Sequence, residues 1–363
     1  MITITPKRIL FLPITSDETP SDPDFIRMLR ERGNEVETRT ISQARSYSLI
    51  LQALRLTSDI RRFDLVIAQE YFSSFGVALR AILSLTASKT KIAVTGFNVS
   101  RRYLVTGSRS VNRIINRIFS RFSLIVVHSR AEARLFCQAH DLDSNRIALS
   151  LWGYDLPRTF HRDTTNPIAK TRGRYICMVG RNNRDFEILT EAIKGTTIRA
   201  IYVASRATDP QLDTTEHIEI LYDIPFDDCL GIIDNSALSV ILLKDEKRGA
   251  GHITAVSAML LGKAQIFSDA DVLHDYLIAN QHGLAVPLND VAAARQAILQ
   301  LFDDQELAER YGRQAREFAL KYLTNMVAQQ RVYKLMNAVL EDTPVELVDA
   351  EWQRQMHTSR QPN

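Results

Sequence analysis

The sequence predicts an α/β protein built from two doubly wound, Rossmann-like domains that face a central cleft. Short, nearly continuous apolar runs alternate with helix-length segments, which is typical of parallel sheets covered on both faces. A polar segment with two prolines, 153–172, interrupts this alternation, which then starts again. The chain of 363 residues is also longer than one hydrophobic core usually supports.

The first half of the sequence is expected to form one parallel sheet. Its strand candidates are short runs rich in Ile, Leu and Val, at 8–14, 64–69, 91–97, 123–129 and 146–152. Between the first two, Phe25, Met28 and Leu29 share one face of an expected helix that Gly33 ends. We therefore expect residues 1–155 to form the first domain.

The second half repeats this rhythm after an expected linker, residues 156–172. Its strand candidates lie at 174–180, 198–204, 218–224, 238–243, 264–269 and 283–288. We expect residues 173–322 to form the second domain and a C-terminal helix, 323–342, to pack back toward the first. Residues 343–363 show little hydrophobic pattern and are expected to be a loose tail.

Composition and charge exclude several classes of protein. No apolar run approaches the roughly 20 residues of a membrane-spanning helix, and the first apolar run is shorter than a signal-peptide core, so we expect a cytoplasmic protein. Three cysteines without a CxxC or Cys/His cluster argue against a disulfide framework or a zinc site. Residues 1–150 carry 22 Lys and Arg against 13 Asp and Glu, whereas the rest carries 23 against 29. This asymmetry predicts that the two domains meet different partners.

A glycine-bearing loop precedes the most informative helix candidate. Gly251 leads into a run of apolar residues, and Gly262 ends the helix. The first N–H groups of such a helix, here those of His252, Ile253 and Thr254, can bind an anion, and the Thr254 hydroxyl can add a hydrogen bond. The alternative is a plain glycine turn before a buried helix.

Five segments in a fixed order carry a resemblance to a known family. They are RFSLIVVHSRAEARLFCQAHDLDSNRIALSLWGYD (121–155), YICMVGRNNRDFEILTEAIKG (175–195), AGHITAVSAMLLGKAQIFSD (250–269), DYLIANQHGLAVPLND (275–290) and LFDDQELAERYGRQAREFA (301–319). Together they resemble the retaining nucleotide-sugar glycosyltransferases of the GT-B fold, the group 1 or family 4-like enzymes. Residues 1–120 match only in their general strand and helix rhythm.

The resemblance implies the GT-B fold and a hexosyltransferase-like activity. A sugar would pass, with retention of configuration, from a UDP- or GDP-sugar to a glycan or a lipid-linked acceptor, in polysaccharide or glycoconjugate synthesis. We expect no cofactor besides the nucleotide-sugar donor and a metal-independent reaction. Two alternatives stay open: a sugar-nucleotide epimerase on the same architecture, and a non-catalytic relative that only binds the nucleotide sugar.

The resemblance places most of the donor site in the second domain. Arg181, directly after the strand-terminal Gly180, matches the family's phosphate-binding arginine, and Arg184 takes the place of the usual lysine. A surface pair of Arg184 with Asp185 at the start of a helix is an equally good interpretation. The base of the nucleotide is expected near residues 222–230.

Three positions follow the family pattern only in part. Ser257 stands where the family has the glutamate that binds ribose, and the other usual glutamate falls near Gly249, so the chain resembles a divergent branch. Ser257 can still donate a hydrogen bond to ribose. Asp275 matches a residue that lies near the donor sugar, although a helix-capping role explains it as well.

The first domain is expected to bind the acceptor. His128, at the end of a strand candidate, is expected to orient the acceptor in the catalytic site, with Glu70 and Asn98 as further candidates and a structural role as the alternative for each. The helix near 109–122 places three arginines on one face, which predicts peripheral contact with the inner face of an anionic membrane. A solvated basic face is the alternative there. No nucleic-acid-binding module is recognised.

Overall fold

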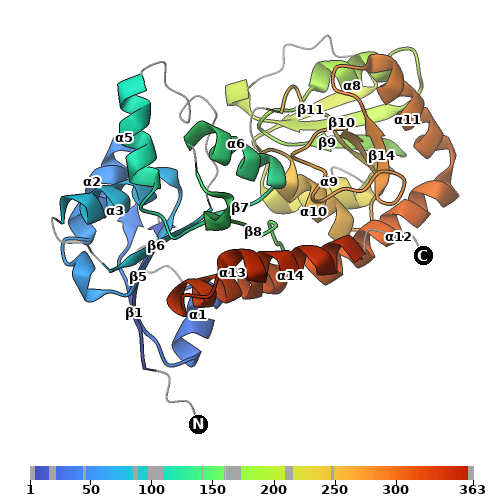
Figure 1. The fold of residues 1–363 in the computed structure, drawn as a ribbon. Coiled ribbons are helices and arrows are strands. Elements are labelled where there is room, and N and C mark those ends of the chain that lie inside the picture. The colour runs from blue at the N-terminus through green and yellow to red at the C-terminus, as the bar shows by residue number, and fades with distance from the viewer. Residues whose placement is uncertain are drawn as a thin grey trace. The chain divides into compact units, whose positions relative to one another are not determined.

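The chain forms two compact units, Met1–Leu151 with Ala328–Asn363, and Trp152–Val327. The computed structural model describes residues 5–15, 22–43, 46–84, 89–96, 109–140, 142–158, 160, 173–208, 216–246 and 249–358, and Figure 1 shows their fold. The first boundary lies four residues before the expected end of the first domain, at 155. Most of the expected linker, and the site candidate Asn98, lie outside the described residues.

A six-stranded parallel sheet forms the centre of the first unit. Its order is β3-β1-β5-β6-β7-β8, with β1 (Arg8–Leu12), β3 (Glu35–Thr38), β5 (Leu65–Gln69), β6 (Lys91–Thr95), β7 (Leu124–Val127) and β8 (Ile147–Leu149). The register pairs Leu10 with Val66 and Val66 with Ile92. Because side chains alternate along a strand, these apolar runs can supply a core on each face of the sheet.

Two layers of helices cover that sheet. The core on one face, with Leu10, Val66 and Ile92, includes residues of α2 (Ser46–Leu56), α3 (Tyr71–Leu83), α5 (Arg109–Phe119) and α6 (Arg130–His140). The core on the other, with Ile9 and Phe11, includes residues of α1 (Asp24–Glu31), α13 (Asn325–Leu340) and α14 (Val345–Thr358). The helices at the end of the chain therefore complete the first unit (Figure 1).

Two predictions for this unit were wrong or incomplete. The expected loose tail, 343–363, instead contains α14, whose Val345 and Val348 pack into the core and whose Asp349 binds Arg331. The edge strand β3, Glu-Val-Glu-Thr, was missed because it is only four residues long and mostly polar, with both glutamates exposed. The short pair β2 (Ile14–Thr15) and β4 (Ile41–Ser42) was missed as well.

The second unit has the dinucleotide-binding strand order. Its parallel sheet runs β11-β10-β9-β12-β13-β14, with β9 (Tyr175–Val179), β10 (Arg199–Ala204), β11 (Ile218–Tyr222), β12 (Leu238–Ile241), β13 (Gln265–Ser268) and β14 (Gly283–Val286). In chain order the strands lie 3-2-1-4-5-6, so the direction of winding reverses between β9 and β12. All eleven strands expected from the sequence, over both units, are confirmed.

Helices again cover both faces of this second sheet. The core that contains Met178 and Val240 includes residues of α8 (Phe186–Ile193), α11 (Val291–Asp303) and α12 (Gln305–Tyr322). The core that contains Cys177 and Val179 includes residues of α9 (Phe226–Asn235) and α10 (His252–Leu260). The fold class is thus α/β with two Rossmann-like units, as expected, and the cleft between them stays a prediction. Within the described part of the chain, the structure has no helix with the length and apolar character that crossing a bilayer demands.

Candidate functional site

The strand order of the second unit fixes where a ligand is expected. In open α/β sheets ligands bind outside the carboxyl ends of the strands, at the point where the winding reverses. Here that point lies between β9 and β12. The loop after β9, residues 180–185, and the segment after β12 that leads into α10 therefore form the candidate site.

These two segments are joined by backbone hydrogen bonds. The Asp185 N–H donates to the carbonyl of Leu242, and the Lys244 N–H donates to the carbonyl of Asn183. The Asp185 carboxylate accepts from the Ile188 N–H and so caps α8. The first turn of α8 and the exit from β12 are thereby held together, which fixes the backbone on either side of Arg184.

Arg184 is the central charge of this site. Its guanidinium donates to the carbonyls of Val179 and Asn182 at 3.1 Å each, and to the Thr254 hydroxyl at 3.2 Å. The residue is only 6% exposed, and burial lowers the pKa of the guanidinium to about 10, so it stays charged at neutral pH. Among the described residues no carboxylate pairs with it. A buried cation whose bonds all go to neutral oxygens is costly and can accept an anion.

The position of Arg184 decides between the two interpretations of its sequence context. Arg184 and Asp185 are both buried and do not form a surface pair, although Asp185 does cap the helix. Gly180 makes room for the guanidinium, because a Cβ there would lie 2.5 Å from Nε of Arg184. The chain thus packs an arginine head group directly against the end of β9.

The N-terminus of α10 lies on the other side of that guanidinium. Its N-cap Gly251 has a φ of 92°, and a Cβ at this position would lie 3.1 Å from Ile241 and 3.8 Å from Nη1 of Arg184. The Thr254 hydroxyl accepts from Arg184 and donates to the Val179 carbonyl at 3.3 Å. No acidic residue occupies the first turn of the helix. The helix start and a buried cation therefore converge on one place, which favours an anionic ligand.

The other residues of this loop have different environments. The His252 ring is stacked on Tyr276 at 4.4 Å, and its Nε2 lies 2.8 Å from the Val272 carbonyl, so its side chain is held within the protein. Ile253 is exposed. Their contribution to ligand binding would come from their backbone N–H groups at the helix start.

Arg181, the first of the two expected phosphate-binding arginines, lies elsewhere. It is exposed, and its charge acts on Asp223, before α9, and on Cys229, in the first turn of α9. Backbone N–H donation from Arg206 lowers the pKa of Asp223, and Arg181 adds to that effect. The structure therefore brings Arg184 to residues 251–254 and Arg181 to the segment where the nucleotide base is expected.

Ser257 and Asp275 are both buried. Ser257 has no exposed surface, and within the described residues its Oγ has no hydrogen-bond partner. Asp275 is 2% exposed and adjoins Tyr276, whose hydroxyl accepts from the Trp152 N–H at 2.8 Å. Contact of either side chain with a donor stays a prediction.

His128 and Glu70 belong to the first unit, at the carboxyl ends of β7 and β5. His128 Nδ1 lies 2.9 Å from the Ser150 carbonyl, and burial lowers the pKa of the ring. Glu70 caps α3 through the N–H groups of Phe72 and Ser73, burial raises its pKa, and its φ of 71° is unusual for a residue other than glycine.

The sequence also contains two relevant signals that the prediction missed. Ser129 and Glu132 form a capping box at the start of α6: the Glu132 N–H donates to Ser129 Oγ, and the Glu132 carboxylate accepts the His128 N–H.

An Asp-x-Asp sequence, Asp269 to Asp271, follows β13, but the His274 ring lies between the two carboxylates, with Nε2 2.7 Å from Asp269 and Nδ1 3.5 Å from Asp271. Within the described ranges no group of three metal-ligating side chains converges.

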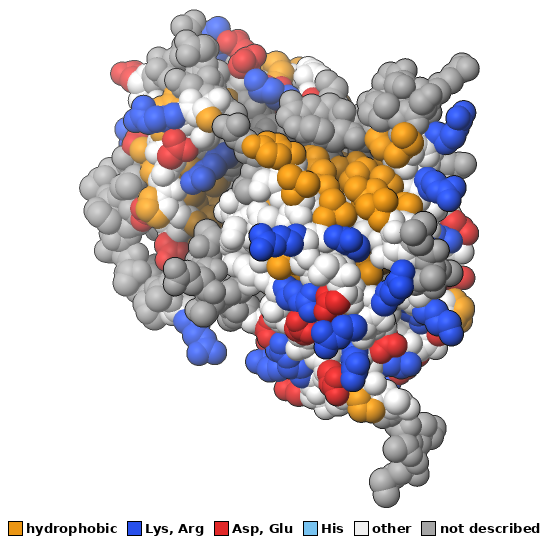
Figure 2. Space-filling view, turned by 90° about the vertical axis from the view of Figure 1, so that its left-hand side faces the viewer, with side chains coloured by type: hydrophobic (Ala, Val, Ile, Leu, Met, Phe, Trp, Pro, Cys, Tyr) orange, Lys and Arg blue, Asp and Glu red, His pale blue; other side chains and the backbone are white. Residues whose placement is uncertain are grey.

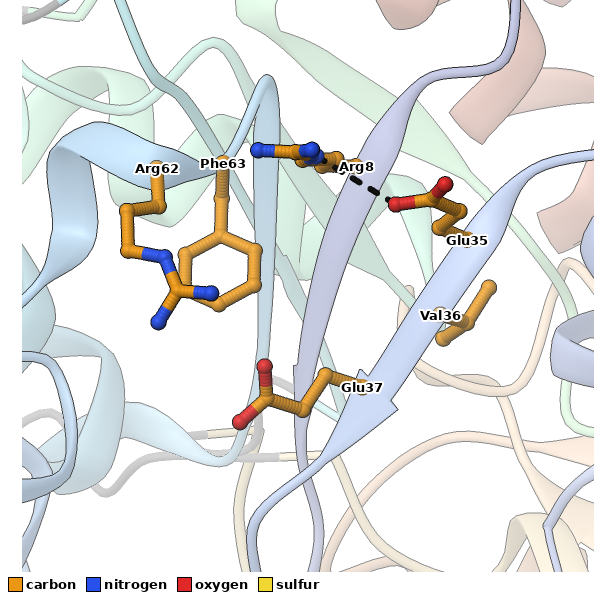
Figure 3. Close-up of a pocket in the computed structure, with 6 residues that line it drawn as sticks. All are labelled: Arg8, Glu35, Val36, Glu37, Arg62 and Phe63. Atoms are coloured by element: carbon orange, nitrogen blue, oxygen red, sulfur yellow. Dashed lines mark hydrogen bonds and ion pairs between the residues drawn. The ribbon is translucent and has the colours of Figure 1, made fainter.

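A shallow hollow of about 430 Å³ in the first unit lies away from the carboxyl edge of its sheet. Figure 3 shows its residues: Arg8 pairs with Glu35 across β1 and β3 at 3.3 Å, and Glu37, Arg62 and Phe63 line the rest. Arg8 and Glu35 begin their strands, and Phe63 precedes β5. The hollow therefore opens at the amino ends of the strands, opposite the edge where α/β sheets bind ligands.

Comparison with known proteins assigns the architecture. Residues 211–318, less than a third of the chain, match the family described as glycosyl transferases group 1. The chain is similar to a glycosyltransferase from Rickettsia africae, with a TM-score of 0.68, 15% identity, and coverage of 93% of this chain and 99% of that one. No curated protein sequence matches.

Two further solved structures have the same fold. Anabaena HepE in complex with UDP and glucose gives a TM-score of 0.65 at 15% identity, over 92% of this chain and 100% of that one. Sucrose-phosphate synthase from Thermosynechococcus elongatus gives 0.67 at 14% identity, over 93% and 100%. At this level of identity the matches show the GT-B fold, and the family match supports kinship of the second unit with the group 1 enzymes.

Proposed function

We propose that this protein is a glycosyltransferase that takes a sugar from a nucleoside-diphosphate sugar, with Arg184 holding the diphosphate. The observation that carries the proposal is the buried guanidinium of Arg184, which pairs with no described carboxylate and lies beside the N-terminus of α10 at the point where the sheet reverses its winding. HepE, which has the same fold, is described in complex with UDP and glucose, and this supports the proposal.

The chemistry requires fixed positive charge at the departing diphosphate. When the bond between the anomeric carbon and the phosphate oxygen breaks, the nucleoside diphosphate gains negative charge. Arg184 and the backbone N–H groups at the start of α10, residues 252–254, would stabilise that charge without reorganising, since both are already held in place. Arg181 would contact the nucleotide from the side of residues 223–229.

We propose that the transfer proceeds with retention of configuration and needs no bound metal. The leaving phosphate would accept the proton of the attacking hydroxyl on the same face of the sugar, so that no protein side chain is needed as a base. The donor is a UDP- or GDP-sugar. Ser257 would offer the ribose a neutral hydrogen bond, which is weaker than one to a carboxylate by about 1 kcal/mol.

The first unit would bind the acceptor, a glycan or a lipid-linked glycan. His128 and Glu70 stand at the carboxyl ends of β7 and β5, the edge of the sheet where ligands bind. The lowered pKa of His128 keeps its ring neutral at pH 7, with Nδ1 donating to the Ser150 carbonyl, and His128 would orient the acceptor. Contact with an anionic membrane would bring a lipid-linked acceptor to this unit.

The test is donor binding by a pair of arginine variants. Thermal shift and calorimetry with UDP-, GDP-, ADP- and CDP-sugars should find at least one ligand that stabilises the protein. Arg184→Met should lower the affinity for that ligand by about 10- to 100-fold, because a charge-assisted bond to phosphate is lost. Arg313→Gln, an exposed arginine on α12, serves as the control. Unchanged affinity in Arg184→Met would overturn the proposed diphosphate site.

Turnover distinguishes transfer from the alternatives. With donor and an acceptor panel, wild type should form a glycoside whose anomeric configuration, read by NMR, matches that of the donor, and Arg184→Met should abolish the reaction. Donor incubated without acceptor should persist. Conversion of the donor to an epimer would instead identify an epimerase, a class that includes a putative UDP-N-acetylglucosamine 2-epimerase from Listeria monocytogenes with the same fold, at a TM-score of 0.56. Tight binding without transfer would identify a binding-only relative.

A further inference from the structure

The helix α3 of the first unit has apolar side chains on its outward face as well as its inward face. Val77, Ala78 and Ala81 are buried against the sheet. On the other side, Phe72, Phe75, Leu79 and Leu83 follow one another at spacings of three and four residues. Phe72 and Phe75 are partly buried and pack against the core, whereas Leu83 is 58% exposed. A helix that covers a sheet normally turns polar residues to solvent. The outward face of α3 therefore lacks the composition of a solvated surface.

The neighbouring helices extend this apolar area. α2 packs against α3 closely, since a Cβ at Gly76 would lie 2.5 Å from the Ile50 carbonyl, and α5 also contacts α3. Tyr47 and Leu51 of α2 and Ile114 of α5 are each more than 60% exposed. On the side of the molecule where these helices lie in Figure 1, Figure 2 shows hydrophobic side chains gathered into one continuous area.

The charges on these three helices are all of one sign. Their sequences contain arginine as the only charged residue type and no Asp or Glu. Arg55, Arg113 and Arg117 are exposed, and Arg80 is half-buried with its guanidinium on the Leu54 carbonyl. Figure 2 shows Lys and Arg side chains along the border of the hydrophobic area. The basic face expected over 109–122 is shorter than expected, because α5 ends at Phe119 and Arg121 is half-buried.

We propose that the outward face of α2, α3 and α5 docks on an anionic lipid bilayer. Tyr47, Leu51, Leu83 and Ile114 would enter the boundary between head groups and acyl chains, and the arginines would reach lipid phosphates while their methylene stems stay in apolar surroundings. Each basic residue near an anionic leaflet adds to the attraction. This surface is distinct from the donor site and is tested without any assay of sugar transfer.

A second copy of the chain fits this face less well. In a two-fold dimer the same patch meets itself, so arginines of one copy would lie against arginines of the other, and the three helices offer no carboxylate to separate them. An anionic lipid surface satisfies both the apolar area and the arginines. The uniformly positive charge of this face therefore favours the membrane.

The experiment is flotation of the full-length protein with phosphatidylcholine vesicles, with and without phosphatidylglycerol. Wild type should float with the anionic vesicles, with a partition coefficient about tenfold or more above that for neutral ones. Leu51→Ser with Leu83→Ser should remove binding to both kinds of vesicle, whereas Arg113→Gln with Arg117→Gln should remove mainly the preference for anionic lipid.

The control is Leu347→Ser on α14, because Leu347 and Leu51 are both 62% exposed and both belong to the first unit. Thermal unfolding of each variant shows that the fold is kept. No flotation by wild type, or equal loss in Leu347→Ser and Leu51→Ser/Leu83→Ser, would overturn the proposal. So would a dimer in light scattering that the double serine variant dissociates while vesicle binding is absent. Donor binding by the second unit is measured separately, so failure here leaves the proposed function standing.

Discussion

The Arg184 guanidinium donates from Nη2 to the Thr254 hydroxyl at 3.2 Å, and this bond joins the loop after β9 to the first turn of α10. The Thr254 hydroxyl donates to the Val179 carbonyl at 3.3 Å, and Nε of Arg184 donates to the same carbonyl at 3.1 Å. The three groups form a closed network around a charge that has no acidic partner in the described chain. The protein thus keeps a cation buried at a place where only neutral oxygens surround it.

That network predicts opposite effects of one substitution on stability and on binding. Arg184→Met removes the desolvation cost of the cation, which exceeds its bonds to neutral oxygens, so the free energy of unfolding should rise by about 1 kcal/mol. Urea unfolding of the ligand-free protein measures this change. Because Arg184 is charged well above neutral pH, the gain should be the same at pH 6 and pH 8. A loss of several kcal/mol would show that Arg184 mainly holds the loop together.

A second prediction concerns Gly251. Alanine there must adopt a φ near 92° and also press on Ile241 and Leu273, so Gly251→Ala should cost more than the roughly 1–2 kcal/mol of the backbone alone. Gly33 has a φ of 95° with nothing within 4 Å of a built Cβ, which makes Gly33→Ala a matched control for the backbone cost. Differential scanning calorimetry compares the two. Donor affinity should fall only in Gly251→Ala, and equal effects in the two variants would argue against crowding at the site.

The buried pair of Arg331 and Asp349 gives a prediction for the first unit. Arg331 also donates to the Leu149 carbonyl at 3.1 Å, and Asp349 accepts the Leu149 N–H at 3.2 Å, so the pair fastens α13 and α14 to β8. Asp349→Ala should destabilise this unit by about 3–5 kcal/mol, because it leaves a buried cation unpaired. Hydrogen exchange read by mass spectrometry should show faster exchange in β8 and α14.

The exposed Glu346 of α14 provides the comparison for that variant. Glu346→Ala removes an acidic residue from the first turn and should cost under about 1 kcal/mol. If both variants exchange alike, the buried pair does not hold the helix. The strands of the second unit, β9 to β14, should keep their protection in either case.

His128 predicts a pH dependence of stability. Burial lowers its pKa in the folded protein below the ordinary 6.5. As pH falls below 6.5, the unfolded chain takes up a proton that the folded ring does not, so the stabilising effect present at higher pH is lost. His128→Gln removes this titration. When the pH is lowered from 7.5 to 5.5, wild type should therefore lose more unfolding free energy than His128→Gln does. An equal loss in both proteins would contradict a lowered pKa.

The sequence predicted the architecture because the strands of both sheets are buried on two faces and are therefore apolar throughout. Val66 and Val240 are examples, each with no exposed surface. The edge strand β3 and the last helix, α14, escaped prediction for the opposite reason. In β3, Glu35 and Glu37 face solvent. In α14, only a few apolar residues occur at helical spacing, among many acidic and polar residues.

The location of the candidate site could be proposed from the sequence, but its details less so. Strand ends and the glycine before α10 predicted a site after β9 and β12, and the structure joins these two segments by backbone hydrogen bonds. Which arginine lies beside Thr254 could not be read from spacing, because the turn at Asn183, with a φ of 57°, sets the direction of the side chain that follows. Both Arg181 and Arg184 were expected to bind phosphate, and the structure places Arg184 beside Thr254.

The division of the chain, with residues up to 151 and from 328 onward in one unit, has a consequence for synthesis. As the nascent chain leaves the ribosome, β1 to β8 are made well before α13 and α14, which cover one face of their sheet. The second unit, made in between as one continuous stretch, can fold first. Until residues 325–358 have been made, Ile9, Phe11 and Val126 lack the part of their cover that α13 and α14 supply, so the growing polypeptide presents an apolar surface to chaperones.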